Sequence, residues 1–150
     1  MSPDRVDLLH QFVAVVWCAG RVDRCADFVH PGYRQHDAAG RVVGRGIDWL
    51  AAAVTVWHET FGSGPTEVLT TVAGAETVAW RWQATAVVRP ELLSEPLRSM
   101  ADEIPELRVV RLRAVTFSTF DEKGLIVADT VISDTMDYLR QLGTTGRWVR

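Results

Sequence analysis

Apolar residues recur at helical spacing through the first third of the chain. This pattern predicts three helices, over residues 2–20, 22–30 and 47–61. Pro31 stops the second helix, and the Gly62–Pro65 stretch stops the third. Between them we expect a short strand over 33–36 and a turn-rich connection over 37–44. The first third of the chain is therefore mainly helical.

Apolar and polar residues alternate through much of the second half, which is typical of half-buried strands. Four strands are predicted, over residues 66–73, 76–87, 107–120 and 125–133. Tight turns join them into two hairpins, and a short helix over 137–142 ends at Gly143. Helices followed by an antiparallel meander predict an α+β fold in which a curved sheet wraps around the helices.

The segment between the two hairpins, residues 91–106, follows neither period. It follows Pro90, contains Pro96 and Pro105, and has two short apolar pairs between them. We interpret it as a long connection with at most one helical turn, and as a candidate lid over a binding site.

Composition narrows the function classes. The 150 residues suit a single domain over the whole chain, 1–150. A net charge of -3 argues against binding nucleic acid or an anionic membrane, and from the residue pattern we expect neither a signal peptide nor a membrane-spanning segment. With only Cys18 and Cys25, we expect no disulfide framework and no zinc site, and a cytoplasmic protein. Six Trp residues suggest a core, a dimer face or an apolar pocket with much aromatic surface.

Alternation along two strands predicts which side chains face inward. Burying the apolar residues of 78–86 turns Trp80 and Trp82 inward and leaves Arg81 outside. On the last strand, Asp129 stands inside a β-branched run and shares a face with Val131. A carboxylate there is unfavourable unless it has a partner or a function.

Several segments together resemble the nuclear transport factor 2-like superfamily, and within it the SnoaL-like polyketide cyclase branch. The resemblance covers most of the chain except about residues 88–107. The matching segments are residues 12–17, 28–37, 44–48, 78–82 and 124–143. It implies a cone-shaped fold, with a bent sheet and three helices around an apolar cavity, and often a homodimer through the outer sheet face. The superfamily includes cyclases, isomerases, an epoxide hydrolase and noncatalytic binding domains, so the pocket residues decide the chemistry.

The resemblance also assigns candidate catalytic residues. His36 falls where ketosteroid isomerases hold their base. The last strand of the cyclase branch commonly carries a His-x-Asp pair; here Asp129 takes the place of the histidine and Val131 that of the acid. Arg34 matches a water-orienting tyrosine of the epoxide hydrolase, whose other catalytic residues are missing. Thr116 takes the place of an isomerase oxyanion-holding acid, and no tyrosine is assigned a partner role. The remaining candidates for substrate contact are Trp17, Trp57, His58, Trp82, Leu112 and Ser133.

The leading hypothesis is a cofactor-independent acid/base cyclase or isomerase. His36 would be the base and Asp129 the acid or the orienting partner. The substrate would be a small hydrophobic, oxygenated, polyketide-type intermediate of secondary metabolism, such as antibiotic biosynthesis. Two alternatives stay open: a noncatalytic ligand-binding module in which Asp129 pairs with His36 or Arg34, and an epoxide-opening, ether-forming cyclase. No motif implies a metal or a nucleotide cofactor.

Overall fold

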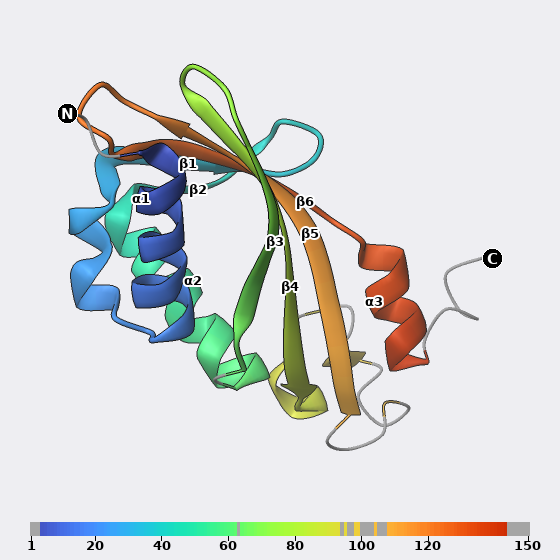
Figure 1. Ribbon diagram of the computed structural model, residues 1–150. Helices are drawn as coiled ribbons and strands as arrows, with labels where there is room; N and C mark the ends of the chain where they lie inside the picture. Colours follow the sequence, from blue (N-terminus) through green and yellow to red (C-terminus); the bar gives the residue numbers. More distant parts are fainter. Residues whose placement is uncertain are drawn as a thin grey trace.

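One bent sheet organises the part of the chain that the computed structural model describes, residues 4–62, 64–93, 95, 98–99, 104 and 108–143 (Figure 1). Its strand order is β2-β1-β6-β5-β4-β3. Neighbours are antiparallel except β1 and β6, which run parallel. The strands are β1 (Val29–His36), β2 (Val42–Arg45), β3 (Thr66–Ala73), β4 (Thr77–Val88), β5 (Arg108–Phe120) and β6 (Ile126–Ser133).

The helices pack against this sheet (Figure 1). Asp4 begins the first one by accepting a hydrogen bond from the Val6 amide at 2.9 Å. That helix widens into π geometry before it ends. The helical segments are α1 (Arg5–Phe12), the π-helix η1 (Val13–Cys18), the 3₁₀ helices η2 (Val22–Asp27) and η3 (Pro90–Leu92), α2 (Gly46–Phe61) and α3 (Thr135–Leu142). The α+β class and the curved sheet expected from the sequence are confirmed.

Two sequence predictions about the early elements are wrong. The second helix is only a short 3₁₀ segment, because the chain enters β1 at Val29, four residues earlier than predicted. Residues 42–45 form strand β2 rather than a turn, since the Val42–Val43 pair favours extended backbone that bonds to β1. Gly44 is required there, because any Cβ at this position would collide with the Trp49 ring.

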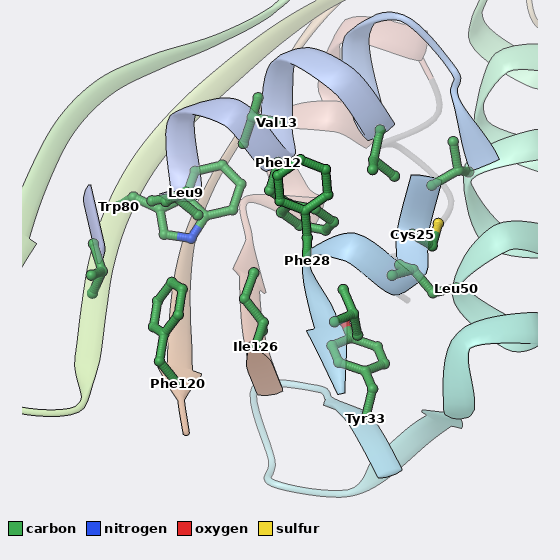
Figure 2. Close-up of a cluster of buried hydrophobic side chains, with 14 residues drawn as sticks. Leu9, Phe12, Val13, Cys25, Phe28, Tyr33, Leu50, Trp80, Phe120 and Ile126 are labelled. Atoms are coloured by element: carbon green, nitrogen blue, oxygen red, sulfur yellow. The ribbon is translucent and has the colours of Figure 1, made fainter. Parts of the chain in front are cut away.

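The main core lies between the helices and the inner face of the sheet. Figure 2 shows its side chains gathered from α1, η2, α2 and four strands. The rings of Phe12 and Phe28 pack with centroids 5.9 Å apart. On β4 the even-numbered residues are buried, apart from the partly buried Trp82, while Arg81 is exposed, which confirms the alternation predicted from the sequence.

A second, smaller core lies under α3. It joins Leu142 to Ala86, Val88 and Val110 of the sheet. Leu93 and Ile104 belong to it, so the connection after β4 contributes buried side chains at these two points. The interpretation of residues 91–106 as a lid falls mostly on positions outside the described residues.

Candidate active site

An apolar chamber of about 240 Å³ opens between α2 and the inner face of the sheet. Four Trp residues line it. The indole rings of Trp17 and Trp57 meet edge to face with centroids 6.1 Å apart, and those of Trp57 and Trp82 do so at the same separation. The lining residues are Trp17, Gln35, Trp57, Thr66, Trp80, Trp82, Thr116, Asp129, Val131 and Ser133.

Two outer recesses extend the space beyond Trp57. The mouth recess, about 620 Å³, is bounded by α2 residues together with Trp17, Gln35, Leu93 and Tyr138. The side recess, about 160 Å³, is lined by Trp57, Phe61, Trp82, Leu112, Arg113, Ser133, Asp134, Thr135 and Tyr138. Trp57 lines all three spaces, and we call the chamber and the two recesses together the aromatic slot.

Asp129 is the buried carboxylate of the chamber, with 5% of its surface exposed. Strand register fixes it: its β6 position pairs with Gln35 of β1 on one side and Ser118 of β5 on the other. Tyr33 donates a hydrogen bond to Oδ2 at 2.9 Å, and Ser118 donates one to Oδ1 at 2.5 Å. The shorter bond, from Ser118, has the length of a charge-assisted hydroxyl–carboxylate bond, and the Tyr33 bond has an ordinary length.

Burial and these donors oppose each other at Asp129. Desolvation raises the pKa of the carboxyl to about 6, although the hydrogen bonds from Ser118 and then Tyr33 act to lower it. Ser118 is itself oriented by Trp80, whose Nε1 donates to the serine Oγ at 2.9 Å. Burial, followed by the nearby carboxylate, raises the pKa of Tyr33, which keeps this phenol a donor. Asp129 can therefore take up and release a proton near neutral pH.

Two further polar groups face the chamber beside the carboxylate. Thr116 Oγ1 accepts a hydrogen bond from Trp82 Nε1 at 3.0 Å, which leaves the threonine proton free for another acceptor. The Gln35 side-chain Oε1 lies 3.3 Å from the Tyr33 hydroxyl. A ligand carbonyl near Asp129 would thus meet a hydroxyl donor and an amide.

The structure does not bring His36 and Asp129 together, so that expectation is wrong. On β1 the buried Tyr33 and the chamber-lining Gln35 take the inner positions. Arg34 and His36 alternate with them and pair with Ala128 and Thr130, on the face opposite Asp129. The alternative pairings of Asp129 with Arg34 or His36 are excluded as well, because its partners are Tyr33 and Ser118.

His58 is also held outside the chamber, contrary to its predicted pocket role. Its Nε2 lies 2.7 Å from the backbone carbonyl oxygen of Trp17, at the end of the π-helix. The preceding residue on α2, Trp57, takes the inward position instead. Gly20 lies beside the imidazole, and its φ of +67° is a backbone conformation that favours glycine.

The other candidates surround the slot. The structure places Trp17, Trp57, Trp82, Thr116, Val131 and Ser133 around the chamber and Leu112 on the side recess. Sequence reasoning missed the tyrosine partner of the carboxylate, Tyr33, together with Gln35. The available signal was burial: Tyr33 is the most apolar residue of 33–36, and placing it inside also turns Gln35 inward.

A family model, SnoaL-like polyketide cyclase, matches residues 7–142. The chain belongs to the SnoaL-like polyketide cyclase family. This family supports a role of the polyketide cyclase type, acting on small hydrophobic substrates. No curated protein matches the sequence. The described residues of this SnoaL-like chain include neither a helix long and apolar enough to cross a membrane nor a cluster of three metal-ligating side chains.

Solved structures share the fold at low identity. TsrD from Streptomyces laurentii superposes with a TM-score of 0.75 and 21% identity, over 96% of this chain and 98% of that one. A SnoaL-like polyketide cyclase from Agrobacterium tumefaciens strain C58 gives 0.74 and 16%, over 93% and 98%. IdmH from Streptomyces antibioticus gives 0.73 and 18%, over 93% and 99%. The cone expected from the resemblance is therefore the fold of this SnoaL-like protein.

Proposed function

We propose that this SnoaL-like protein is a cofactor-independent cyclase in which Asp129 moves the proton. One observation supports the proposal above all: a carboxylate with a pKa near 6 stands at the inner end of an indole-walled chamber. A carboxyl with that pKa is mostly ionised at pH 7 yet is a stronger base than an ordinary carboxylate, which suits it to accept a proton and then return it. His36 has no part in this mechanism, because it lies on the other face of the sheet.

The reaction is an intramolecular aldol closure of a poly-β-ketone. Ionised Asp129 removes a proton from a carbon between two carbonyls, and the resulting enolate attacks a distant carbonyl carbon of the same chain. The new alkoxide takes the proton back from Asp129, so the reaction needs no redox partner and leaves the carboxylate unchanged. Thr116 and Gln35 donate hydrogen bonds to the enolate oxygen, which stabilises its developing charge.

The substrate is a hydrophobic, oxygenated polyketide-type intermediate. Trp17, Trp57 and Trp82 offer flat apolar surfaces on which an extended polyketone or its first aromatic ring can lie. The chamber also keeps bulk water from the enolate, which limits unproductive protonation.

The test compares Asp129→Asn with His36→Gln. Each variant is incubated with a linear poly-β-ketone generated by a minimal polyketide synthase, and the cyclised products are quantified by mass spectrometry. Asp129→Asn should lower the rate of enzyme-catalysed ring formation by about 100-fold or more, which is the usual contribution of a general acid/base. His36→Gln should form the ring at a rate within about twofold of that of the parent protein. Thermal unfolding of both variants confirms that they are folded.

Equal turnover by Asp129→Asn and the parent protein would refute the acid/base role. It would favour the alternative of a noncatalytic module of the same fold. One observation supports that alternative: both carboxylate oxygens of Asp129 already accept hydrogen bonds from the protein. Ligand binding without any change in product would then be the expected behaviour. Epoxide opening would be assigned instead if a substrate that carries an epoxide and an internal hydroxyl were converted to a cyclic ether.

A further inference from the structure

Tyr138 carries a buried hydroxyl that has no partner within the described part of the chain. The residue lies in the middle of α3, and its ring packs edge to face on Phe61 of α2, with centroids 6.4 Å apart. Among the buried side-chain oxygen and nitrogen atoms of the described residues, it is the one without a hydrogen bond. Since burial raises the pKa of Tyr138 to about 12, the group is a neutral phenol under physiological conditions.

A buried hydroxyl without a partner destabilises a protein, because it has lost its water and gained nothing in exchange. Such groups in folded proteins call for an explanation. A ligand would explain it, because Tyr138, which packs against the second core, also lines cavity space. It contributes to both the mouth recess and the side recess.

The two ends of the slot are therefore both polar, with aromatic walls between them. Asp129 lies in the inner chamber, and Tyr138 lines the recesses on the other side of Trp57. Trp82 and Ser133 line both the chamber and the side recess, so these two spaces are neighbours with part of their lining in common. Phe61 extends the aromatic wall, with its ring 4.8 Å from Trp57.

We propose that Tyr138 is a ligand-binding residue whose hydroxyl hydrogen-bonds an oxygen at the end of the ligand remote from Asp129. The ligand class is a flat, fused or fusing aromatic polyketide with oxygen substituents at both ends. This proposal rests on the proposed function for the identity of the inner end. A poly-β-ketone carries oxygen on alternate carbons, so an oxygen is available wherever the outer end falls, whereas a fatty acyl tail would leave Tyr138 unpaired.

The test measures binding rather than turnover. Quenching of tryptophan fluorescence reports occupancy, since four of the six Trp residues line the chamber. The probes are two diols of different length, naphthalene-2,6-diol and 2,6-dihydroxyanthraquinone, each paired with its 2-hydroxy analogue. The single hydroxyl of an analogue should pair with Asp129, because a charged acceptor makes the stronger bond. The second hydroxyl of a diol then reports on Tyr138.

In the parent protein, at least one diol should bind about three- to tenfold more tightly than its analogue, the gain typical of one neutral hydrogen bond. Tyr138→Phe should abolish that gain and leave the affinity for the analogue unchanged. The proposal is overturned if no diol binds more tightly than its analogue, or if Tyr138→Phe weakens diol and analogue equally. Because this experiment measures binding and no turnover, it tests the role of Tyr138 even if the catalytic role of Asp129 is refuted.

A matched control separates ligand binding from a structural role. Tyr33→Phe removes a phenol that has a protein partner, Asp129, whereas Tyr138→Phe removes one without a partner. Tyr33→Phe should therefore lower the melting temperature, and Tyr138→Phe should leave it unchanged or raise it. A drop for Tyr138→Phe as large as that for Tyr33→Phe would show that the hydroxyl bonds to the protein, and would overturn the proposal.

Discussion

At the scale of single residues, the site is a carboxylate placed where its charge is unfavourable and then supported by donors. Ser118 and Tyr33 each hold one oxygen of Asp129, yet desolvation still dominates and raises the pKa of the carboxyl to about 6. The fold therefore prefers the protonated acid more than the unfolded chain does, which makes stability depend on pH.

Replacing Asp129 by Asn should reveal this dependence. An ordinary Asp titrates near 3.9 when unfolded, so the extra stability from the protonated carboxyl is fully present below about pH 4 and is lost as pH rises through about 6. The free energy of unfolding of Asp129→Asn, relative to that of the parent, should thus rise by on the order of 2–3 kcal/mol between pH 4 and pH 7. Urea unfolding of both proteins across this range measures the difference, in which other titrating groups cancel. A difference that stays constant with pH would contradict the raised pKa.

Residue types alone identified Asp129 as an unusual carboxylate but could not identify its partners. The sequence itself shows that Asp129 is a charged residue inside a β-branched run. Arg34 and His36 were attractive partners because both are polar and can pair with a carboxylate. Their orientation depends on Tyr33, whose complete burial sets the phase of the strand. Phase is a tertiary property here, since both faces of 33–36 contain polar residues.

At the scale of elements, the long strands were predictable because their alternation is regular. The bounds of β3 match the prediction, and those of β4, β5 and β6 differ from it by one residue at either end. Strand β2 was missed because it has only four residues and exists through pairing with β1. The 3₁₀ segment η2 was mistaken for a helix because its apolar spacing is helical, although Phe28 ends it and Val29 enters the sheet.

A side chain of α3 takes the place of a missing strand beside β5. Strand β6 ends opposite Ala114, and among the described residues no strand pairs with the preceding part of β5 on that side. Gln141 of α3 replaces the missing pairing: its Oε1 accepts from the Arg111 amide at 2.7 Å, and its Nε2 donates to the Arg111 carbonyl at 2.8 Å. The helix is thereby tied to the same stretch of β5 that supports the second core.

Removing this amide should loosen α3. Gln141→Ala breaks two hydrogen bonds to the backbone of Arg111 and is expected to lower the free energy of unfolding by about 1–2 kcal/mol. Amide hydrogen exchange at residue 111 should accelerate in parallel. The matched control is Arg140→Ala, which removes only an exposed ion pair with Asp137 and should change stability by less than about 0.5 kcal/mol. Equal effects of the two substitutions would refute a specific role for Gln141.

At the scale of the whole molecule, the bent sheet has two faces with different tasks. The inner face carries the slot and both cores. The outer face presents apolar side chains in register: Phe117 pairs across with Ala79, which pairs with Val72, and the next row pairs Val115 with Ile132. Exposed apolar patches of this kind commonly mark protein interfaces.

We propose that a second copy of the chain covers this face, making a homodimer through the row centred on Phe117. Phe117 is 40% exposed, Ile132 44% and Val72 66%, and a twofold axis lets each copy bury the patch of the other. Phe117→Glu places a charge at the centre of the patch, where its desolvation opposes association. Analytical ultracentrifugation should show a dimer for the parent and a monomer for this variant.

The matched substitution is Met136→Glu, on α3, where the replaced side chain is 50% exposed and lies outside the strands. It adds the same charge and should leave the dimer intact. A monomeric parent at micromolar concentration would disprove the dimer, and dissociation by both variants would show that net charge rather than the patch governs association. Since the slot lies on the inner face, the Phe117→Glu monomer should still bind the diol probes, which would separate assembly from ligand recognition.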